Sequence, residues 1–398
     1  MRIGLDARYL AASPAGIGRY SRALMEAMFR LAPQVEWVVL VHESLPAGWP
    51  PAPPPRFELH RHPSRPVSRF TVGALGRWIR AQRLDLWHAM FPLAPRCPVP
   101  MVTTVHDLQP LQCQGWNGKR PWPLPWAYER FYRWGYGRTV RQARRVIAIS
   151  RWTASSVAEF WPGAAPKTTV IPYGLETTWA ERCREEEAPT PASPSIVYAG
   201  STRPNKNLRN LIDAFSLLTR CEEIADTLRL RLVVVRDRFW PDIERRIHTL
   251  GLAERVDVCA PLGDEALTRE YRRASALAFA TTHEGFGLPP LEAMACGCPV
   301  VAARHGALPE TCGDAAEYVD PADPEDIARG LAVALTKGPR REALIAAGYR
   351  RAALRRWDEA ARETLAVYGV VLGAEDLGSA PHAARSEERG DAFGTLRD

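Results

Sequence analysis

Short apolar runs alternate with longer amphipathic stretches from one end of the chain to the other. Runs of about four to eight apolar residues, bounded by polar or turn-forming residues, are typical of buried strands. The segments between them are long enough for helices, so parallel, doubly wound sheets with both faces covered are expected. The predicted class is α/β, and the predicted strands span residues 2–6, 37–41, 84–89, 99–105, 146–150, 196–200, 230–235, 256–259, 277–280, 300–302 and 316–319.

A charged, proline-rich interval divides this pattern into two halves. Residues 185–195 contain three glutamates followed by three prolines, which suits neither a helix nor a central strand and indicates a linker. Because 398 residues exceed what one core usually organises, we predict two Rossmann-like domains, 1–184 and 196–356. The ligand site should lie in the cleft between them, at the carboxyl ends of the strands. Residues 373–398 are polar and aperiodic, which is typical of a disordered tail.

The amino-acid composition indicates what kind of partner the protein binds, but not which reaction it catalyses. The net charge of +7 and the pI near 9.1 suggest an anionic partner, such as a nucleotide, a nucleic acid or a membrane surface. The sequence shows no uncharged apolar stretch long enough to cross a membrane and no signal-peptide pattern at its start. The eight cysteines contain no C-x-x-C pair and are expected to be reduced thiols. These features predict a cytoplasmic protein.

The run from His283 to Val301 carries the strongest chemical signal. Glu284 and Glu292 flank a turn that contains Gly285 and Gly287 and opens a helix, whose free N–H groups attract anions such as phosphate. A carboxylate on each side of that turn would repel a phosphate, so the natural partners of the two glutamates are neutral hydroxyls. Hydroxyls flanking a diphosphate describe a nucleotide sugar. A solvated helix start is the alternative interpretation.

A second turn with phosphate-binding character follows the first predicted strand of the second half. Gly200 and Ser201 lie between that strand and a helix predicted over 208–218, with Arg203 and Lys206 near the helix N-terminus. A diphosphate would find N–H groups and positive charge there together. A solvated basic loop is the alternative interpretation.

One long motif resembles a known family. The run Glu-Gly-Phe-Gly-Leu-Pro-x-Leu-Glu-Ala-Met-Ala-x-Gly-x-Pro-Val-Val, which begins at Glu284, is similar to the E-x7-E signature of family 4 glycosyltransferases. The resemblance implies the GT-B fold, in which two Rossmann-like domains face a central cleft, and a retaining sugar transfer. It also implies a closing helix, here 357–372, that returns from the second domain to the first.

The resemblance also implies roles for the donor-site candidates. Glu292 would hold the ribose hydroxyls of a nucleotide-sugar donor, and Glu284 would contact the donor sugar. Lys206 would hold the diphosphate. Arg203 is a weaker candidate, because the family usually has a basic residue directly before the lysine, where this chain has Asn205. The backbone amides that would help to hold the diphosphate are those of Gly285, Phe286, Gly287 and Leu288.

The loop after the first strand is a further candidate. Gly16 and Gly18 permit a tight turn ahead of a helix predicted over 21–31, although a plain strand-to-helix connection is the alternative. Similar Gly-Ile-Gly-Arg-Tyr loops in the family border the donor and the acceptor. Gly16 and Gly18 are therefore included among the donor-binding candidates.

Two histidines end predicted strands, where functional groups of α/β sheets collect. His106, followed by Asp107, is the stronger candidate, because the matching histidine of family relatives contacts the donor sugar. His88 and Asp107 are second-rank candidates. A structural role within the sheet is the alternative for a single histidine.

No metal or other cofactor is expected. The sequence contains no Asp-x-Asp triplet and no cluster of His and Cys ligands. The charge of the leaving diphosphate would instead be neutralised by Lys206, Arg203 and helix amides.

The segment 119–151 is strongly basic and aromatic. It carries nine Lys and Arg residues against a single acid, Glu129, with Trp, Tyr and Phe between them. A solvated basic face over an aromatic core stripe competes with docking on the anionic cytoplasmic leaflet, where many family members act on lipid-linked acceptors. No recognised motif supports nucleic-acid binding.

These signals predict a retaining, metal-independent hexosyltransferase. The acceptor would be a glycan or lipid-linked saccharide of cell-surface polysaccharide synthesis, placing the protein in the cytoplasm or at the inner face of the plasma membrane. Mannose from GDP-mannose is the first choice, because Tyr-x-Gly-Ser-x-x-Pro-x-Lys-Asn-Leu and Ile-Pro-Tyr-Gly, with Tyr173 replacing the commoner asparagine, resemble motifs of bacterial mannosyl- and rhamnosyltransferases. Two other classes stay open: an epimerase or hydrolase on the same fold, and a non-catalytic sugar-nucleotide-binding protein.

Overall fold

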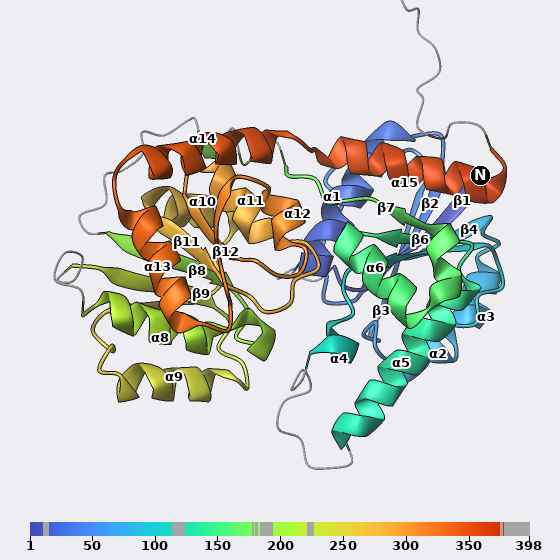
Figure 1. Ribbon diagram of the computed structural model, residues 1–398. Helices are drawn as coiled ribbons and strands as arrows, with labels where there is room; N and C mark the ends of the chain where they lie inside the picture. Colours follow the sequence, from blue (N-terminus) through green and yellow to red (C-terminus); the bar gives the residue numbers. More distant parts are fainter. Residues whose placement is uncertain are drawn as a thin grey trace, which may run out of the picture.

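Two separate parallel sheets form the two halves of the molecule (Figure 1). The computed structural model describes residues 1–10, 16–113, 124–176, 179, 182–183, 194–220, 227–374 and 377. The predicted linker and the predicted tail lie almost wholly outside these ranges, so both stay predictions.

The N-terminal half is built on a sheet whose central strands are almost entirely buried. The strand order is β3 (Phe57–His62), β2 (Glu36–His42), β1 (Arg2–Asp6), β4 (Leu86–Ala89), β5 (Met101–Val105), β6 (Arg145–Ala148) and β7 (Thr168–Val170). The direction of winding reverses between β1 and β4, and such switch points are where ligands of α/β sheets collect. The helices are α1 (Gly16–Leu31), α2 (Arg69–Val72), α3 (Leu75–Ala81), α4 (Gln109–Gln112), α5 (Leu124–Gln142) and α6 (Arg151–Phe160).

The C-terminal half repeats this architecture. Its strand order is β10 (Val256–Cys259), β9 (Arg229–Val234), β8 (Ser195–Gly200), β11 (Ala276–Phe279), β12 (Val300–Ala303) and β13 (Ala316–Val319). Its helices are α8 (Leu208–Leu218), α9 (Trp240–Thr249), α10 (Asp264–Arg273), α11 (Leu288–Ala295), α12 (Leu308–Cys312), α13 (Pro324–Leu335) and α14 (Pro339–Ala353). The last helix, α15 (Trp357–Leu372), leaves this half and crosses to the N-terminal one (Figure 1).

Every apolar run predicted as a strand forms one, within two residues at either end. The apolar pattern misses β3 and β7, the two edge strands of the N-terminal sheet. β3 reads Phe-Glu-Leu-His-Arg-His with no fully buried residue, and β7 has only three residues, none of them fully buried. Edge strands of this kind give a weak hydrophobic signal because much of their surface faces solvent.

The first helix begins five residues earlier than predicted, at Gly16 instead of Ser21. Glycine costs roughly 1 kcal/mol relative to alanine within a helix. Burial of Gly18 and Tyr20, and a 2.8 Å hydrogen bond from the Ser21 hydroxyl to the Ile17 carbonyl, offset that cost. Tertiary packing therefore overrides the local preference of the glycines.

Helix α15 is joined to the N-terminal sheet by a buried polar chain. It packs on α1, and the Tyr368 hydroxyl lies 2.5 Å from Nδ1 of His88. Nε2 of His88 lies 2.8 Å from Oγ1 of Thr104, which in turn lies 2.9 Å from the Tyr20 hydroxyl. Burial lowers the pKa of His88 to about 3, so the ring is neutral. His88 thus lies in the joint with α15, inside the N-terminal core.

Removing the hydroxyl of Tyr368 should weaken this joint. In Tyr368→Phe, Nδ1 of His88 stays buried without a partner, and we expect the free energy of unfolding to fall by about 1–3 kcal/mol. Urea denaturation followed by circular dichroism measures the change. Tyr349→Phe, at a tyrosine that is 51% exposed, is the matched control and should leave stability unchanged. Equal stability of both variants would contradict the structural role of His88.

Candidate active site

A glycine turn brings the backbone of the C-terminal half against the N-terminal half. It joins β11 to α11 and contains Glu284, Gly285 and Gly287. A Cβ on residue 285 would collide with the carbonyl of His106, so only glycine permits this approach. Gly287 has a φ of 111°, a left-handed conformation that glycine adopts without strain. The turn therefore lies on the boundary between the halves.

Amide donors at this boundary must come from the turn itself. The second and third residues of α11 are Pro289 and Pro290, which have no N–H group. The candidate donors are those predicted, the amides of 285–288. Threonine 311 holds the turn in place, because its hydroxyl donates to the Phe286 carbonyl at 2.7 Å.

Glu284 is brought together with Lys206. The Lys206 Nζ lies 2.6 Å from Oε2 of Glu284, and both side chains are largely buried. Lys206 ends a short 3-10 turn ahead of α8, and Asn205 in that turn donates to the His283 carbonyl at 3.1 Å. The two predicted donor-site turns are therefore neighbours, with their acid and base in contact.

Glu292 is paired with a residue that the sequence interpretation missed. Its side chain is 1% exposed, and Oε1 lies 2.5 Å from Nη1 of Arg19, in the first turns of α1. The Tyr271 hydroxyl donates weakly to Oε2 at 3.4 Å. Burial raises the pKa of Glu292, and the Arg19 guanidinium opposes that rise. A cation directly after the Gly-x-Gly turn was the available signal for Arg19.

His106 lies beside the glycine turn with both ring nitrogens engaged. Nε2 is 2.8 Å from the Met90 carbonyl, which can only accept, so Nε2 carries the proton. The Tyr173 hydroxyl then donates to Nδ1 at 2.6 Å, and the Tyr173 ring packs on Phe286. Burial lowers the pKa of His106 to about 4. The imidazole is therefore neutral near pH 7.

A small pocket, partly open to solvent, lies between the turn and the N-terminal half. Asp107, Trp152 from α6, and Glu284 are among its lining residues. Burial raises the pKa of Asp107 to about 6, Glu284 adds to the rise, and Lys206 opposes it. The pocket thus brings two predicted site carboxylates together across the boundary.

Glu310 is a second interdomain contact that the sequence interpretation missed. Its carboxylate accepts from the backbone amides of Arg151 at 2.9 and 3.0 Å and of Trp152 at 3.3 Å. These amides open α6, where a helix carries free donors and a positive dipole end. A glutamate of the C-terminal half therefore caps a helix of the N-terminal half.

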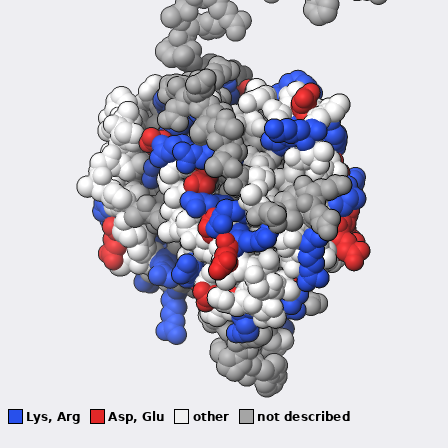
Figure 2. All heavy atoms as spheres, turned by 90° about the vertical axis from the view of Figure 1, so that its left-hand side faces the viewer, with Lys and Arg blue, Asp and Glu red and all other residues white. Residues whose placement is uncertain are grey.

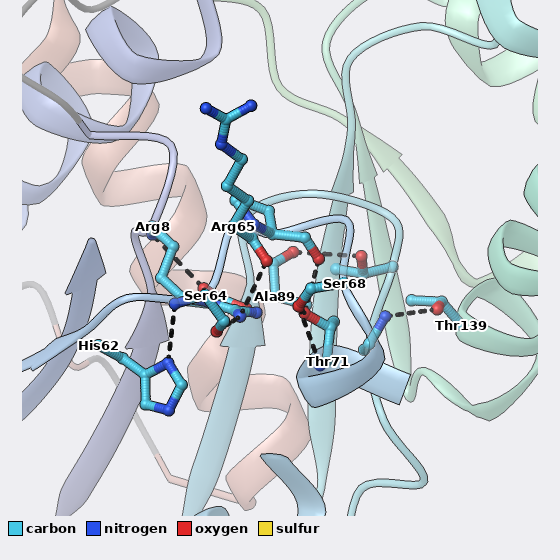
Figure 3. Close-up of polar contacts among 12 residues, drawn as sticks. Arg8, His62, Ser64, Arg65, Ser68, Thr71, Ala89 and Thr139 are labelled. Atoms are coloured by element: carbon cyan, nitrogen blue, oxygen red, sulfur yellow. Dashed lines mark hydrogen bonds and ion pairs between the residues drawn. The ribbon is translucent and has the colours of Figure 1, made fainter. Parts of the chain in front are cut away.

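A polar network joins the carboxyl ends of β1 and β3 in the N-terminal half (Figure 3). Arg8, 2% exposed, pairs with Asp6 at 2.7 Å and donates to the Ser64 hydroxyl at 3.1 Å. The Ser64 amide donates to Nδ1 of His62 at 3.0 Å. The exposed side chain of Arg65 points away from the network (Figure 3). The network fixes the loop after β3 on this side of the molecule.

Two family models together match most of the chain. The one described as Glycosyltransferase Family 4 matches residues 14–179, and the one described as Glycosyl transferases group 1 matches residues 181–351. A D-inositol 3-phosphate glycosyltransferase from Actinosynnema mirum is 30% identical over 327 residues, covering 75% of this chain and 76% of the relative. The chain belongs to the family 4 glycosyltransferases.

Another relative is similar in sequence, and two solved structures are similar in fold. O-antigen chain mannosyltransferase B from Escherichia coli is 26% identical over 67% of this chain and 69% of that protein. Sucrose-phosphate synthase from Thermosynechococcus elongatus has a TM-score of 0.73 at 20% identity, covering 94% of this chain and 99% of that one. HepE from Anabaena, in complex with UDP-glucose, has a TM-score of 0.70 at 16% identity, covering 93% and 100%. The structural matches show the GT-B fold.

The remaining candidates of this family 4 glycosyltransferase are less completely placed. Gly16 and Gly18 lie in the first turn of α1, and the loop before them, 11–15, is outside the described residues. Gly200 and Ser201 follow β8, where the Tyr198 hydroxyl donates to the Ser201 carbonyl at 2.7 Å. Arg203 precedes the short turn that ends at Lys206. Leu288 is the first residue of α11.

Replacing Asp107 should change the pH dependence of stability. Because its folded pKa is raised, the folded chain holds a proton that the unfolded chain has lost, and stability falls as the pH rises from about 4 through 6. Asp107→Asn removes this penalty, so at pH 8 we expect it to exceed the wild type by about 1–3 kcal/mol. At about pH 3.5 the two should be equal, since both side chains are then neutral.

Thermal or urea unfolding of both proteins at the two pH values measures this difference. Asp314→Asn, at an aspartate whose side chain is 82% exposed, is the matched control and should change stability little at either pH. A wild type that is as stable as Asp107→Asn at pH 8 would contradict the raised pKa.

Proposed function

We propose that this glycosyltransferase moves a hexose, with mannose from GDP-mannose as first choice, from a nucleoside diphosphate sugar to a glycan or lipid-linked saccharide of cell-surface polysaccharide synthesis. The observation that carries the proposal is the placement of Glu284, Lys206 and Glu292 around one glycine turn at the domain boundary. A donor with an anionic centre and hydroxyls on both sides complements that arrangement of charge.

In this proposal, each part of the donor would have a partner among these residues. The diphosphate would displace Glu284 from Lys206, because a phosphate oxygen is an equally good anionic partner for the ammonium group. Glu284 would then accept hydrogen bonds from hydroxyls of the sugar. Glu292, four residues into α11, would accept from the ribose hydroxyls. Lys206 and the amides of 285–288 would stabilise the leaving diphosphate without a metal ion.

Retention of anomeric configuration is proposed on the family likeness. In a front-face attack, the acceptor hydroxyl approaches from the side of the leaving diphosphate, a diphosphate oxygen takes its proton, and the bond from the anomeric carbon to that diphosphate breaks. His106 is neutral at pH 7, and both its ring nitrogens are bonded to Tyr173 and Met90, so a hydrogen bond to the sugar would have to replace one of these two. Asp107 lines the pocket, and its carboxyl group would be placed to orient an acceptor hydroxyl.

The mannosyl donor is supported by two relatives. The Escherichia coli protein is an O-antigen chain mannosyltransferase, and a protein from Mycolicibacterium hassiacum, 29% identical over 68% of this chain and 65% of that protein, is an MMP alpha-(1->4)-mannosyltransferase. Other relatives of similar identity are D-inositol 3-phosphate glycosyltransferases. The chain matches about two thirds of the length of these relatives. The thermal-shift screen described below tests which nucleotide base is bound.

Docking on an anionic membrane is the second part of the proposal. Helix α5 extends beyond the body of the N-terminal half (Figure 1), with Trp126 and Trp134 58% and 48% exposed. Arg130 and Arg138 lie over these two rings, at 4.8 and 4.6 Å from the ring centres. On the face formed by the C-terminal half, by contrast, basic and acidic side chains are interspersed (Figure 2). Among the described residues, no helix is long and apolar enough to span a bilayer.

Replacing the two glutamates should impair different properties, nucleotide binding for Glu292 and sugar transfer for Glu284. A donor nucleotide at about 100 times its dissociation constant stabilises the protein by roughly 2.7 kcal/mol. Glu292→Ala should abolish the melting-point shift with nucleotide. Glu284→Ala should keep the shift and lose transfer by about 100-fold or more. A screen of GDP, UDP, dTDP and ADP sugars by thermal shift, followed by a transfer assay with labelled sugar, measures both effects.

Glu254→Ala, at an exposed glutamate of the C-terminal half, is the matched control and should behave as the wild type. If no nucleotide shifts the melting point of the wild type, the transferase proposal fails. Label that passes to water in the presence of acceptor would favour a hydrolase. Binding without any turnover would favour a sugar-nucleotide-binding protein.

The exposed tryptophans of α5 should contribute to membrane binding. We expect Trp126→Ala/Trp134→Ala to bind phosphatidylserine vesicles at least about tenfold more weakly than the wild type, because interfacial rings and basic side chains act together there. Vesicle co-sedimentation measures the binding, and phosphatidylcholine vesicles should retain neither protein. Tyr349→Ala, at an exposed tyrosine of α14, is the control. Equal binding by the wild type and the double variant would rule out docking through α5.

A further inference from the structure

Arg19 is the more exposed partner of the ion pair that it forms with Glu292. The guanidinium contacts Oε1 of Glu292 at 2.5 Å, and its side chain is 23% exposed while that of Glu292 is 1% exposed. Oε1 is buried and accepts no well-aligned hydrogen bond from the described residues. A ligand that binds to Oε1 of this carboxylate would therefore compete with Arg19 for it.

A second acid is already within reach of the same guanidinium. Nη2 of Arg19 lies 3.5 Å from Oδ1 of Asp264, the first residue of α10, whose side chain is 40% exposed. The guanidinium also lies over the ring of Trp179, 5.5 Å from its centre. Because guanidinium has five N–H donors in a fixed fork, a small shift exchanges one acid for the other without leaving the ring.

From this geometry we propose that Arg19 is a further donor-site residue, which holds Glu292 while the site is empty and moves onto Asp264 when the ribose hydroxyls take its place. The inference rests on the proposed function, since it takes the ligand of Glu292 to be a ribose. It adds a residue from the N-terminal domain to a donor site otherwise built from the C-terminal one.

The exchange leaves no charge without a partner. A buried carboxylate that simply lost its cation would be strongly destabilised. Here Glu292 would gain two hydroxyl donors, while Arg19 stays close by and tightens its contact with Asp264. Arg182, whose Nη1 lies 4.0 Å from Oδ2 of Asp264, would remain on the other oxygen of that acid. Because Arg19 belongs to α1, binding of the nucleoside is coupled to the contact between the domains.

The test compares GDP with 2′,3′-dideoxy-GDP, which has no ribose hydroxyls, by titration calorimetry on the full chain. The proteins are the wild type, Asp264→Asn, Arg19→Met and the double variant. We expect Asp264→Asn to weaken GDP binding about fivefold, because Arg19 loses its alternative partner. The same substitution should not change the affinity for dideoxy-GDP. In the Arg19→Met background, it should not change the affinity for GDP either.

Three results would overturn the exchange: unchanged GDP affinity in Asp264→Asn, equal weakening of both nucleotides, or the same weakening without Arg19. Wild-type protein that binds GDP and dideoxy-GDP equally well would also overturn it, since the ribose would then not engage Glu292. Wild-type protein that binds none of the nucleotides in the thermal-shift screen would instead be a failure of the proposed function. Asp314→Asn is the matched control for the substitution of a surface aspartate.

Discussion

The two carboxylates of the E-x7-E turn lie at the domain boundary, and each needs a positive partner there. Burying an ionised carboxylate is costly unless a cation or several hydrogen-bond donors accompany it. Glu284 has Lys206 from the same domain, and Glu292 has Arg19 from the other. The closeness of the two domains at this point therefore supplies part of the charge balance of the site.

The other contacts between the domains hold them close together at this turn. Glycine at 285 lets the turn meet the carbonyl of His106, and Phe286 packs on Tyr173, whose hydroxyl donates to Nδ1 of His106. Farther out, Glu310 caps α6 across the boundary. Helix α15 ties the two halves together a second time, because its first residue, Trp357, lies against the backbone at residue 174 so closely that only glycine fits there. The proposed donor site and the return of the chain through α15 are thus parts of one interface between the domains.

Local patterns predicted most of the fold. Central strands show themselves as apolar runs, and helix α8 was predicted at its observed bounds because its buried face and flanking turn are both local. The glycine turn and the turn that ends at Lys206 were also predicted, since glycine-rich turns between a strand and a helix have local signatures; their phosphate-binding role stays a prediction. The edge strands β3 and β7 of the N-terminal sheet and the start of α1 were missed, because solvent exposure in one case and tertiary packing in the other overrode the local signal.

The partners of the site residues could not be predicted from the sequence, for a different reason. Arg19 and Glu292 are 273 positions apart, and Glu310 caps a helix whose first residue is Arg151. No spacing rule connects residues so distant. For His88, the local pattern suggested a functional role, because the residue lies near the end of a strand. Its contact with Tyr368 could not be predicted, since it forms only when α15 packs on the first domain.

The most direct test is a crystal structure with an intact nucleoside diphosphate sugar bound. The division of labour between the carboxylates predicts Glu292 within about 3 Å of both ribose hydroxyls, Lys206 on the diphosphate and Glu284 on a sugar hydroxyl. A bound donor whose ribose faces solvent, with Arg19 still on Glu292 and Lys206 still on Glu284, would contradict it.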